Sequence, residues 1–131
     1  EMNLYPCAYS MTFNVTHKEG DEKLTLNAIL NQRSQDVLAA NNWNVCQYAI
    51  LLMMVAQVCG YKPREFIHTF GDLHIYKNHL EQVKTQLSRE PRKLPVLHLN
   101  PARKNIRDFV FEDFVFEGYD PHPSIKAPIA V

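Results

Sequence analysis

Apolar and polar residues alternate along two stretches near the start of the chain. The first covers residues 8–17, where every second side chain from Tyr9 to Val15 is apolar, and the second covers residues 24–31. Alternation with a period of two is typical of a strand with one buried face. The intervening residues 18–22 are polar and contain Gly20, so the two stretches are predicted to form a β-hairpin.

A long apolar segment follows after a polar loop. Residues 45–59 have no polar face, which predicts a helix that is buried on most sides. Gly60 is expected to end this helix, and Asn44 to cap its start by accepting an unpaired N–H of the first turn. We expect a connection at residues 61–65 and a short buried strand at residues 66–70.

The remaining chain has weaker periodicity. Asn78 is expected to begin a second helix, because Glu81 follows at the spacing of a capping box, and Pro91 lies beyond its end. After it we expect a strand at residues 96–99, a helical turn at 105–109 and a strand at 111–116. The fold class that we predict is α+β, with a mixed β-sheet packed by the long buried helix.

Composition and charge narrow the functional classes. The chain has 131 residues, a formal net charge of zero, 46% hydrophobic and 21% charged residues, which is typical of a globular protein. No basic excess points to nucleic acid, and no charge run points to a membrane surface. The most apolar run, residues 48–58, is shorter than the about 20 residues that a bilayer requires.

The three cysteines are odd in number and widely spaced. Cys7, Cys46 and Cys59 form neither a zinc pattern nor a disulfide framework, so a reducing compartment fits best. The chain also begins without the basic segment of a signal peptide. The expected localisation is therefore cytoplasmic, without a membrane anchor.

Cys7 is the leading candidate for chemistry. It follows Pro6 at the head of the first alternating stretch, where proline stiffens the backbone and one side stays open. A nucleophilic cysteine needs a nearby cation that lowers the pKa of its thiol, and Arg33 is the candidate. For a lone Pro-Cys pair, however, a buried and inert thiol is the commoner situation.

Four further motifs favour the chemical interpretation. They are Gln32-Arg33-Ser34-x-Asp36, Gly71-Asp72-x-His74-x-Tyr76-x-Asn78-His79, Ser88-Arg89-Glu90-Pro91-Arg92 and Gly118-Tyr119-Asp120-Pro121-His122-Pro123. Together with Pro6-Cys7, and in this order, they resemble thymidylate synthase. The resemblance runs from about Leu4 to Val131 and covers only the C-terminal half of such an enzyme. It implies that residues 1–131 are the C-terminal catalytic portion of a single domain.

The resemblance implies a reaction and its partners. The enzyme would convert dUMP to dTMP with 5,10-methylenetetrahydrofolate, through a covalent bond between Cys7 and C6 of the uracil, and without a metal. It would be a homodimer with sheets packed back to back, and it would need the N-terminal half of the domain, which carries further catalytic and phosphate-binding residues.

The resemblance also assigns site residues. Arg33 and Ser34 would hold the phosphate, Asn44 would read the uracil, and His74 with Tyr76 would bind the 3′-hydroxyl. The full dUMP set is Gln32, Arg33, Ser34, Gln35, Asp36, Asn44, His74, Ile75 and Tyr76. The folate set is Leu4, Asp36, Ala40, Trp43 and Ala130, with the terminal segment, residues 127–131, closing over the folate.

Asn44 bears on the choice of base. A side-chain amide offers one donor and one acceptor, which match O4 and N3–H of uracil, and we expect it to reject cytosine. Without the resemblance, Asn44 as a simple helix cap and Arg33 as a solvated surface residue remain alternatives.

Four positions depart from the family's usual pattern. Ala8 stands where a histidine commonly follows the nucleophile, and Gln35 where a cysteine is common. Ala40 replaces a glycine near the folate, and Trp43 replaces a phenylalanine. Two other functions stay open: a nucleotide hydroxymethylase, which ends the reaction with water, and a fragment that keeps the fold without catalysis.

Overall fold

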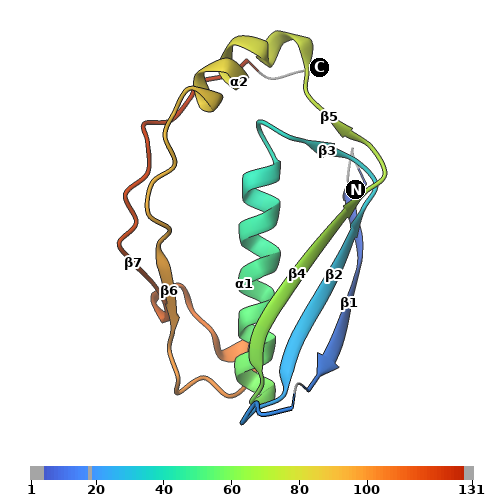
Figure 1. Cartoon of the computed structure of the whole chain (residues 1–131), viewed down its shortest axis with the longest axis vertical. Helices are drawn as coiled ribbons and strands as arrows, with labels where there is room; N and C mark the ends of the chain where they lie inside the picture. Colours follow the sequence, from blue (N-terminus) through green and yellow to red (C-terminus); the bar gives the residue numbers. More distant parts are fainter. Residues whose placement is uncertain (1–4, 18, 129–131) are drawn as a thin grey trace. The chain divides into compact units, whose positions relative to one another are not determined.

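The computed structural model of the chain describes residues 5–17 and 19–128 (Figure 1). The chain forms two compact units, Glu1–Ile75 and Tyr76–Val131, each with its own sheet pairing. The helices and strands are mixed along the chain, so the predicted α+β class is confirmed. Leu4 and Ala130, both predicted to bind folate, lie outside the described residues.

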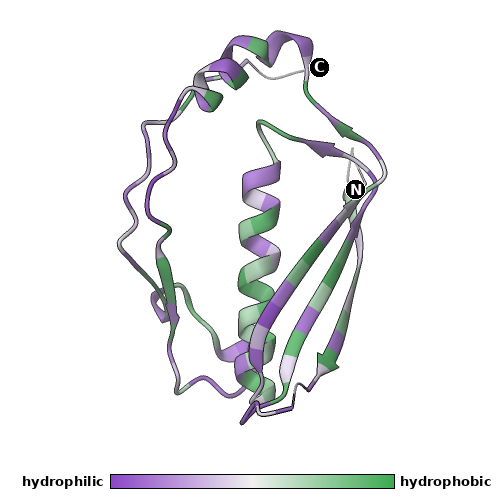
Figure 2. Cartoon of the chain, viewed as in Figure 1, coloured by the Kyte–Doolittle hydropathy of each residue, from purple (hydrophilic) through white to green (hydrophobic). Residues whose placement is uncertain are grey.

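The first unit is built on a three-stranded sheet in the order β1-β2-β4. The hairpin is confirmed: β1 (Ala8–Thr16) pairs antiparallel with β2 (Thr25–Gln32). β4 (Lys62–Phe70) pairs parallel with β2 on its other edge. Figure 2 shows the alternation of apolar and polar residues as bands along these strands, and the apolar face of β2 is the buried one.

The crossover from β2 to β4 is made by α1 (Asn41–Cys59). Gly60 ends it as predicted, in a left-handed conformation with φ of 74° that glycine adopts without steric cost. The predicted cap is wrong, because Ala40 occupies the N-cap position and Asn44 lies inside the first turn. The helix therefore begins four residues earlier than the apolar pattern suggested.

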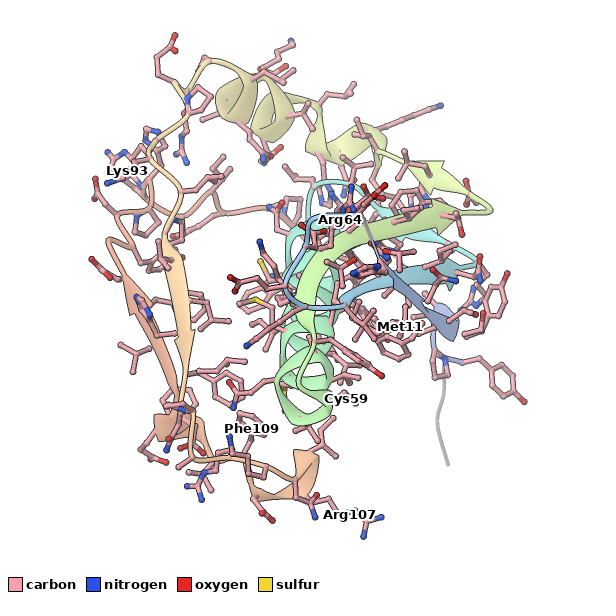
Figure 3. All side chains as sticks on the ribbon, turned by 60° about the horizontal axis from the view of Figure 1, so that its bottom comes forward. Met11, Cys59, Arg64, Lys93, Arg107 and Phe109 are labelled. Carbon is pink, nitrogen blue, oxygen red and sulfur yellow. The ribbon has the colours of Figure 1, made fainter. Side chains whose placement is uncertain are left out.

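The core of this unit lies between α1 and the sheet. Leu26 and Ala28 of β2 meet Leu52 and Ala56 of α1, and all four are nearly inaccessible to solvent. The two alanines allow the helix and the sheet to approach closely, and Met11, labelled in Figure 3, packs against the same cluster. The prediction that α1 is buried on most sides is wrong for this chain. Among the described residues of the helix, only Leu52 and Ala56 are fully buried.

β4 is longer than predicted. Residues 62–65, expected to be a connection, belong to the strand although Pro63 lacks an N–H. Proline is tolerated there because β4 is the outer strand in the order β1-β2-β4, and the register shifts beside it between Leu26 and Ala28. At that irregularity the side-chain oxygen of Asn27 accepts the Glu65 N–H at 3.3 Å.

The second unit has short elements. It contains the 3-10 turn η1 (Lys77–His79), α2 (Leu80–Leu87), the antiparallel pair β6 (Val96–Leu99) and β7 (Phe114–Glu117), and the turns η2 (Ile106–Asp108) and η3 (Phe111–Asp113). The strand at 96–99 is confirmed, as is the turn near 105–109, where Arg107 lies within η2 and Phe109 follows it (both labelled in Figure 3). The predicted strand 111–116 is partly wrong, because its first half is η3.

The start of α2 also corrects the prediction. Asn78 lies within η1, and His79 takes the N-cap position without a side-chain bond to the helix. His79 is instead buried, with Nε2 at 2.7 Å from the carbonyl oxygen of Pro128. Together with the Arg92–Asp120 ion pair at 2.7 Å, this contact holds the segment 120–128 along the region of α2.

One buried carboxylate organises the loop before β7. Asp113 accepts hydrogen bonds from Arg103 Nε at 2.7 Å, Asn100 Nδ2 at 2.7 Å and the Val110 N–H at 2.8 Å. The bond from the Arg103 guanidinium is the main cause that lowers the pKa of the Asp113 carboxyl to about 2. These hydrogen bonds connect the two ends of the loop 100–113, and both oxygens of the buried carboxylate have partners.

Candidate active site

Cys7 and Arg33 are brought together by the hairpin. The Arg33 N–H donates to the Cys7 carbonyl oxygen at 2.8 Å, one step beyond the paired residues Ala8 and Gln32. Arg33 Nη2 donates to the carbonyl oxygen of Tyr5 at 2.7 Å, so the guanidinium is anchored two residues before the cysteine. The hairpin thus brings the backbone of Arg33 to Cys7, whose thiol is partly exposed, and anchors the guanidinium on the same short segment of the chain.

Gly71 allows the chain to pass close to this arginine. Its N–H donates to the Gln32 carbonyl oxygen at 2.9 Å, and a Cβ at this position would lie 3.0 Å from the Arg33 carbonyl oxygen. The three nearest atoms all belong to the backbone of Arg33, so a side chain would fit only if that backbone moved. The glycine of the Gly71-Asp72 motif is therefore explained by close approach of two backbones.

A two-residue parallel bridge joins two of the predicted motifs. β3 (Gln35–Asp36) pairs with β5 (Leu73–His74), so that Asp36 and His74 are register partners. The Gln35 N–H donates to the Asp72 carbonyl oxygen at 2.8 Å, and His74 Nδ1 lies 3.2 Å from Asp72 Oδ2. This bridge was not predicted, because two residues are too few to show an alternating pattern.

Asp36 has a structural role in the turn that leads to α1. Its Oδ1 accepts the N–H groups of Leu38 at 3.0 Å and Ala39 at 3.2 Å. The turn continues directly into the helix, because the Ala40 N–H donates to the Asp36 carbonyl oxygen at 3.2 Å. This is the physical reason why the helix starts before Asn44.

Three predicted residues share one buried hydrogen-bond network. Gln32 Nε2 donates to the Ser34 carbonyl oxygen at 2.7 Å, to Asn44 Oδ1 at 3.3 Å and to Gln35 Oε1. Only 3% of Gln32 and 1% of Gln35 is exposed. Gln35, which departs from the family's usual cysteine, is therefore a full member of the network.

His68 completes this network and was missed from the sequence. Its Nε2 lies 2.9 Å from Gln32 Oε1, and its ring centroid is 4.1 Å from that of Phe70. Burial lowers the pKa of His68, which favours the neutral ring. The available signal was the alternation Phe66-x-His68-x-Phe70, which places the histidine on the inward face of β4.

The other predicted residues are more open. Ala40 caps α1, Trp43 in its first turn is 77% exposed, and Ile75 follows β5. Tyr76 opens the second unit, where its ring meets that of His79 edge to face with centroids 5.7 Å apart. The two members of the predicted sugar-binding pair, His74 and Tyr76, thus belong to different compact units.

No group of three potential metal-ligating side chains occurs among the described residues. A hollow of about 380 Å³ in the first unit lies over the outer face of the sheet and is lined by residues that include Thr12, Asn27 and Arg64. None of the predicted site residues is among those that line it. In the part of the chain that the structure describes, no helix is long and apolar enough to cross a membrane.

Comparison with known proteins decides the family. The family model described as thymidylate synthase matches residues 1–131. The chain belongs to the thymidylate synthase family. Among solved structures, the thermostable thymidylate synthase A from Bacillus subtilis matches with a TM-score of 0.88 and 37% sequence identity.

The structural match covers different shares of the two chains. It includes 99% of this chain but 45% of the Bacillus subtilis chain, so the sequence spans less than half the length of that relative.

Proposed function

We propose that residues 1–131 are the C-terminal catalytic portion of an enzyme that converts dUMP to dTMP with 5,10-methylenetetrahydrofolate. The observation that carries the proposal is the joining of Cys7 to Arg33 through the hairpin, with the guanidinium anchored on Tyr5. A nucleophile and a cation held at the same end of the β1–β2 hairpin suit attack on an anionic nucleotide. Membership in the thymidylate synthase family supports the substrate class.

Cys7 is proposed to act as the nucleophile. Its thiolate sulfur adds to C6 of the uracil, the C5–C6 double bond opens, and the electron pair passes to C5 and O4. Arg33, whose backbone contacts that of Cys7, supplies a positive charge for the anionic nucleotide close to the point of attack. C5 takes up the one-carbon unit and gives up its proton to a base of the N-terminal half. At the end of the reaction the S–C6 bond breaks, the double bond forms again and Cys7 leaves as a thiolate.

The nucleotide is proposed to bind across several elements. Arg33 and Ser34 hold the phosphate, since a guanidinium and a hydroxyl both donate to phosphate oxygens. Asn44 contacts the uracil and His74 the deoxyribose, and Gln32, Gln35, Asp36, Ile75 and Tyr76 complete the set.

The residues also fit a folate. Asp36 presents a carboxylate held by the turn to α1, which can accept from amino and ring N–H groups of a pterin. Trp43 offers an exposed indole, and Ala40, at the N-cap of the same helix, has a small side chain. When bound, the folate supplies the one-carbon unit and the hydride that the methylation requires.

A nucleotide hydroxymethylase is the second candidate, since it would use the same nucleophile and end with water. The orientation of Asn44 favours a uracil nucleotide over the cytosine version of that reaction, because its carbonyl oxygen faces Gln32. The amide NH₂ group is then available for O4 of a uracil.

The chain is further proposed to need the N-terminal half of the domain and a second subunit. Apolar side chains of α1 outside Leu52 and Ala56 remain partly exposed, and the chain spans 45% of its relative. On the outer face of the sheet, Ile29 and Ile67 are register partners and are both exposed, which suits sheets packed back to back.

The test is mass spectrometry of the chain combined with the upstream half of a related enzyme, after incubation with 5-fluoro-dUMP and methylenetetrahydrofolate. Fluorine at C5 does not leave as a proton does, so the adduct on Cys7 should persist. We expect a mass increase equal to nucleotide plus folate on the peptide that contains Cys7. Absence of any adduct on Cys7 would reject the proposal, and the chain alone should form none.

A further inference from the structure

An asparagine does not by itself distinguish uracil from cytosine. Rotation of the amide by half a turn exchanges its NH₂ group and its oxygen, so a freely turning Asn44 would match the polar edge of either base. The expectation that the amide alone rejects cytosine was therefore incomplete. Something in the protein has to fix which end of Asn44 faces the substrate.

We propose that His68 and Gln35 are positioning residues that, through Gln32, hold Asn44 with its NH₂ group towards the nucleotide and so make the site select uracil. The inference rests on the proposed function, because it concerns the nucleotide site of that reaction. It is carried by the directions of the hydrogen bonds that meet at Gln32.

The first fixed point is a backbone carbonyl. The Ser34 oxygen can only accept, so the end of Gln32 that lies 2.7 Å from it is the NH₂ group. The opposite end of Gln32, which faces His68 at 2.9 Å, is then the oxygen. His68 must therefore carry its proton on Nε2 and act as the donor.

Gln35 supports the same direction from a second carbonyl. Its Nε2 lies 3.1 Å from the Asp36 carbonyl oxygen, which again can only accept. The oxygen of Gln35 is thereby turned to the NH₂ group of Gln32. Two backbone carbonyls, from opposite sides, thus specify one orientation of Gln32.

The direction is passed on to Asn44. The two protons of the Gln32 NH₂ group are shared among three acceptors, of which Asn44 at 3.3 Å is the most distant, and because this group can only donate, Asn44 has to present its oxygen there. Its NH₂ group can then donate to uracil O4, while the second lone pair of its oxygen accepts from N3–H. Cytosine requires the reversed amide, which would set two NH₂ groups against each other.

Burial prevents these side chains from adopting another hydrogen-bond arrangement. Gln32 is 3% and Gln35 1% exposed, so water does not readily replace a lost partner. The ring of His68 lies between Phe66 and Phe70, with centroids 5.7 and 4.1 Å away, which restricts its rotation. Because burial lowers the pKa of His68, the ring keeps a single proton at neutral pH.

The test compares three variants with the parent protein, each combined with the upstream half of a related enzyme. His68→Phe removes the donor and keeps a ring between Phe66 and Phe70. His68→Gln restores a donor and serves as the rescue. His17→Phe is the matched control, because His17 is exposed and its Nε2 lies 3.3 Å from the Asp21 carbonyl oxygen in the hairpin loop.

The first measurement is ¹⁵N NMR of the ring of His68 and the side-chain amide of Asn44, which needs no turnover. We expect the parent His68 to be protonated on Nε2 and His68→Phe to shift the Asn44 amide signals. The second is the ratio of dCMP to dUMP dissociation constants. We expect this ratio to fall about tenfold or more in His68→Phe, to recover in His68→Gln and to be unchanged in His17→Phe.

A proton on Nδ1 of His68, or Asn44 amide signals that do not move in His68→Phe, would overturn the network. Shifted signals with an unchanged dissociation ratio would overturn its role in base selection. If the parent protein bound neither nucleotide, the proposed function would fail, and the NMR measurement would still decide whether His68 orients Asn44.

Discussion

The two units of the chain hold their functional side chains by different means. In the first unit, neutral amides and backbone groups position one another, as in the buried contacts among Gln32, Gln35 and Asn44. In the second unit charges are used, either on the surface, as in Arg92–Asp120, or in the buried cluster around Asp113.

The difference has a physical cause. Burying a charge costs far more free energy than burying an amide, so a carboxylate is retained inside only when both of its oxygens accept hydrogen bonds. Asp113 meets that condition with three donors. A site that recognises the polar edge of a base depends more on the direction of its hydrogen bonds than on their strength. An amide provides one donor group and one acceptor at fixed places. The comparison predicts that substitutions in the first unit change recognition and catalysis, whereas those in the second change stability with pH.

The largest expected effect is that of Cys7→Ser. Turnover of the complemented protein should fall by several orders of magnitude, because a hydroxyl provides very little of its anionic form at neutral pH. Binding of dUMP should be nearly unchanged, since the backbone contact of Cys7 with Arg33 remains. Steady-state kinetics and calorimetric titration measure the two effects, and Cys59→Ser at the end of α1 is the control. If Cys7→Ser retained its turnover, Cys7 would not be the nucleophile, and the first unit would not differ from the second in carrying the chemistry.

Leu52→Ala should reduce stability strongly within the first unit. Leu52 is 3% exposed and packs against Leu26 and Ala28, so its truncation leaves a cavity and should cost about 2–5 kcal/mol. Chemical denaturation measures the loss, and hydrogen exchange followed by peptide mass spectrometry shows which unit opens. Leu87→Ala, at an 80% exposed position of α2, should change stability by less than about 0.5 kcal/mol. Equal effects of the two substitutions would contradict the core assigned to the first unit.

Gly71→Ala should disturb the site through the backbone. The added Cβ would lie 3.0 Å from the Arg33 carbonyl oxygen, and relief of this contact should cost about 1–3 kcal/mol and displace Arg33. Gly20→Ala is an informative control, because its φ of 90° makes alanine strained while no atom lies within 4 Å. Both variants should lose stability, measured by denaturation, but only Gly71→Ala should weaken dUMP binding. Similar nucleotide affinity in the two variants would argue against the close approach as a feature of the site.

Asp113→Asn should produce the smallest effect at neutral pH and a distinct one in acid. The pKa of Asp113 is lowered from 3.8 to about 2, so the unfolded chain binds its proton more readily than the folded chain. The stability that Asp113 contributes is present above pH 4 and is lost as the pH falls through about 2. The Asn variant should be less stable at pH 7, and its second unit should lose less amide protection between pH 4 and 2. Hydrogen exchange of peptides from residues 76–131 provides the measurement, and an unchanged acid profile would show that Asp113 does not govern this unit.

Sequence reasoning predicted an element correctly where the residues of that element alone determine its structure. The alternation of residues 8–17 and 24–31 predicted the hairpin, and Gly60 predicted the end of α1. It failed where a neighbour from elsewhere in the chain decided the outcome. The N-terminal end of β4 was missed because its exposed, charged residues gain strand structure only by pairing with β2. Asn44 was taken for a cap, although the turn around Asp36 starts the helix earlier.

For the candidate site, the sequence by itself determined the residue types and their order, including Cys7, Arg33 and Asn44, and hence the resemblance to thymidylate synthase. Only the tertiary structure decided that His68 joins them and which way each amide points. The periods of strands and helices are local properties of the chain and can be read from neighbouring residues. The direction of a buried hydrogen bond depends on which donors and acceptors the sheet brings within about 3 Å, and here they come from β2, β3, α1 and β4.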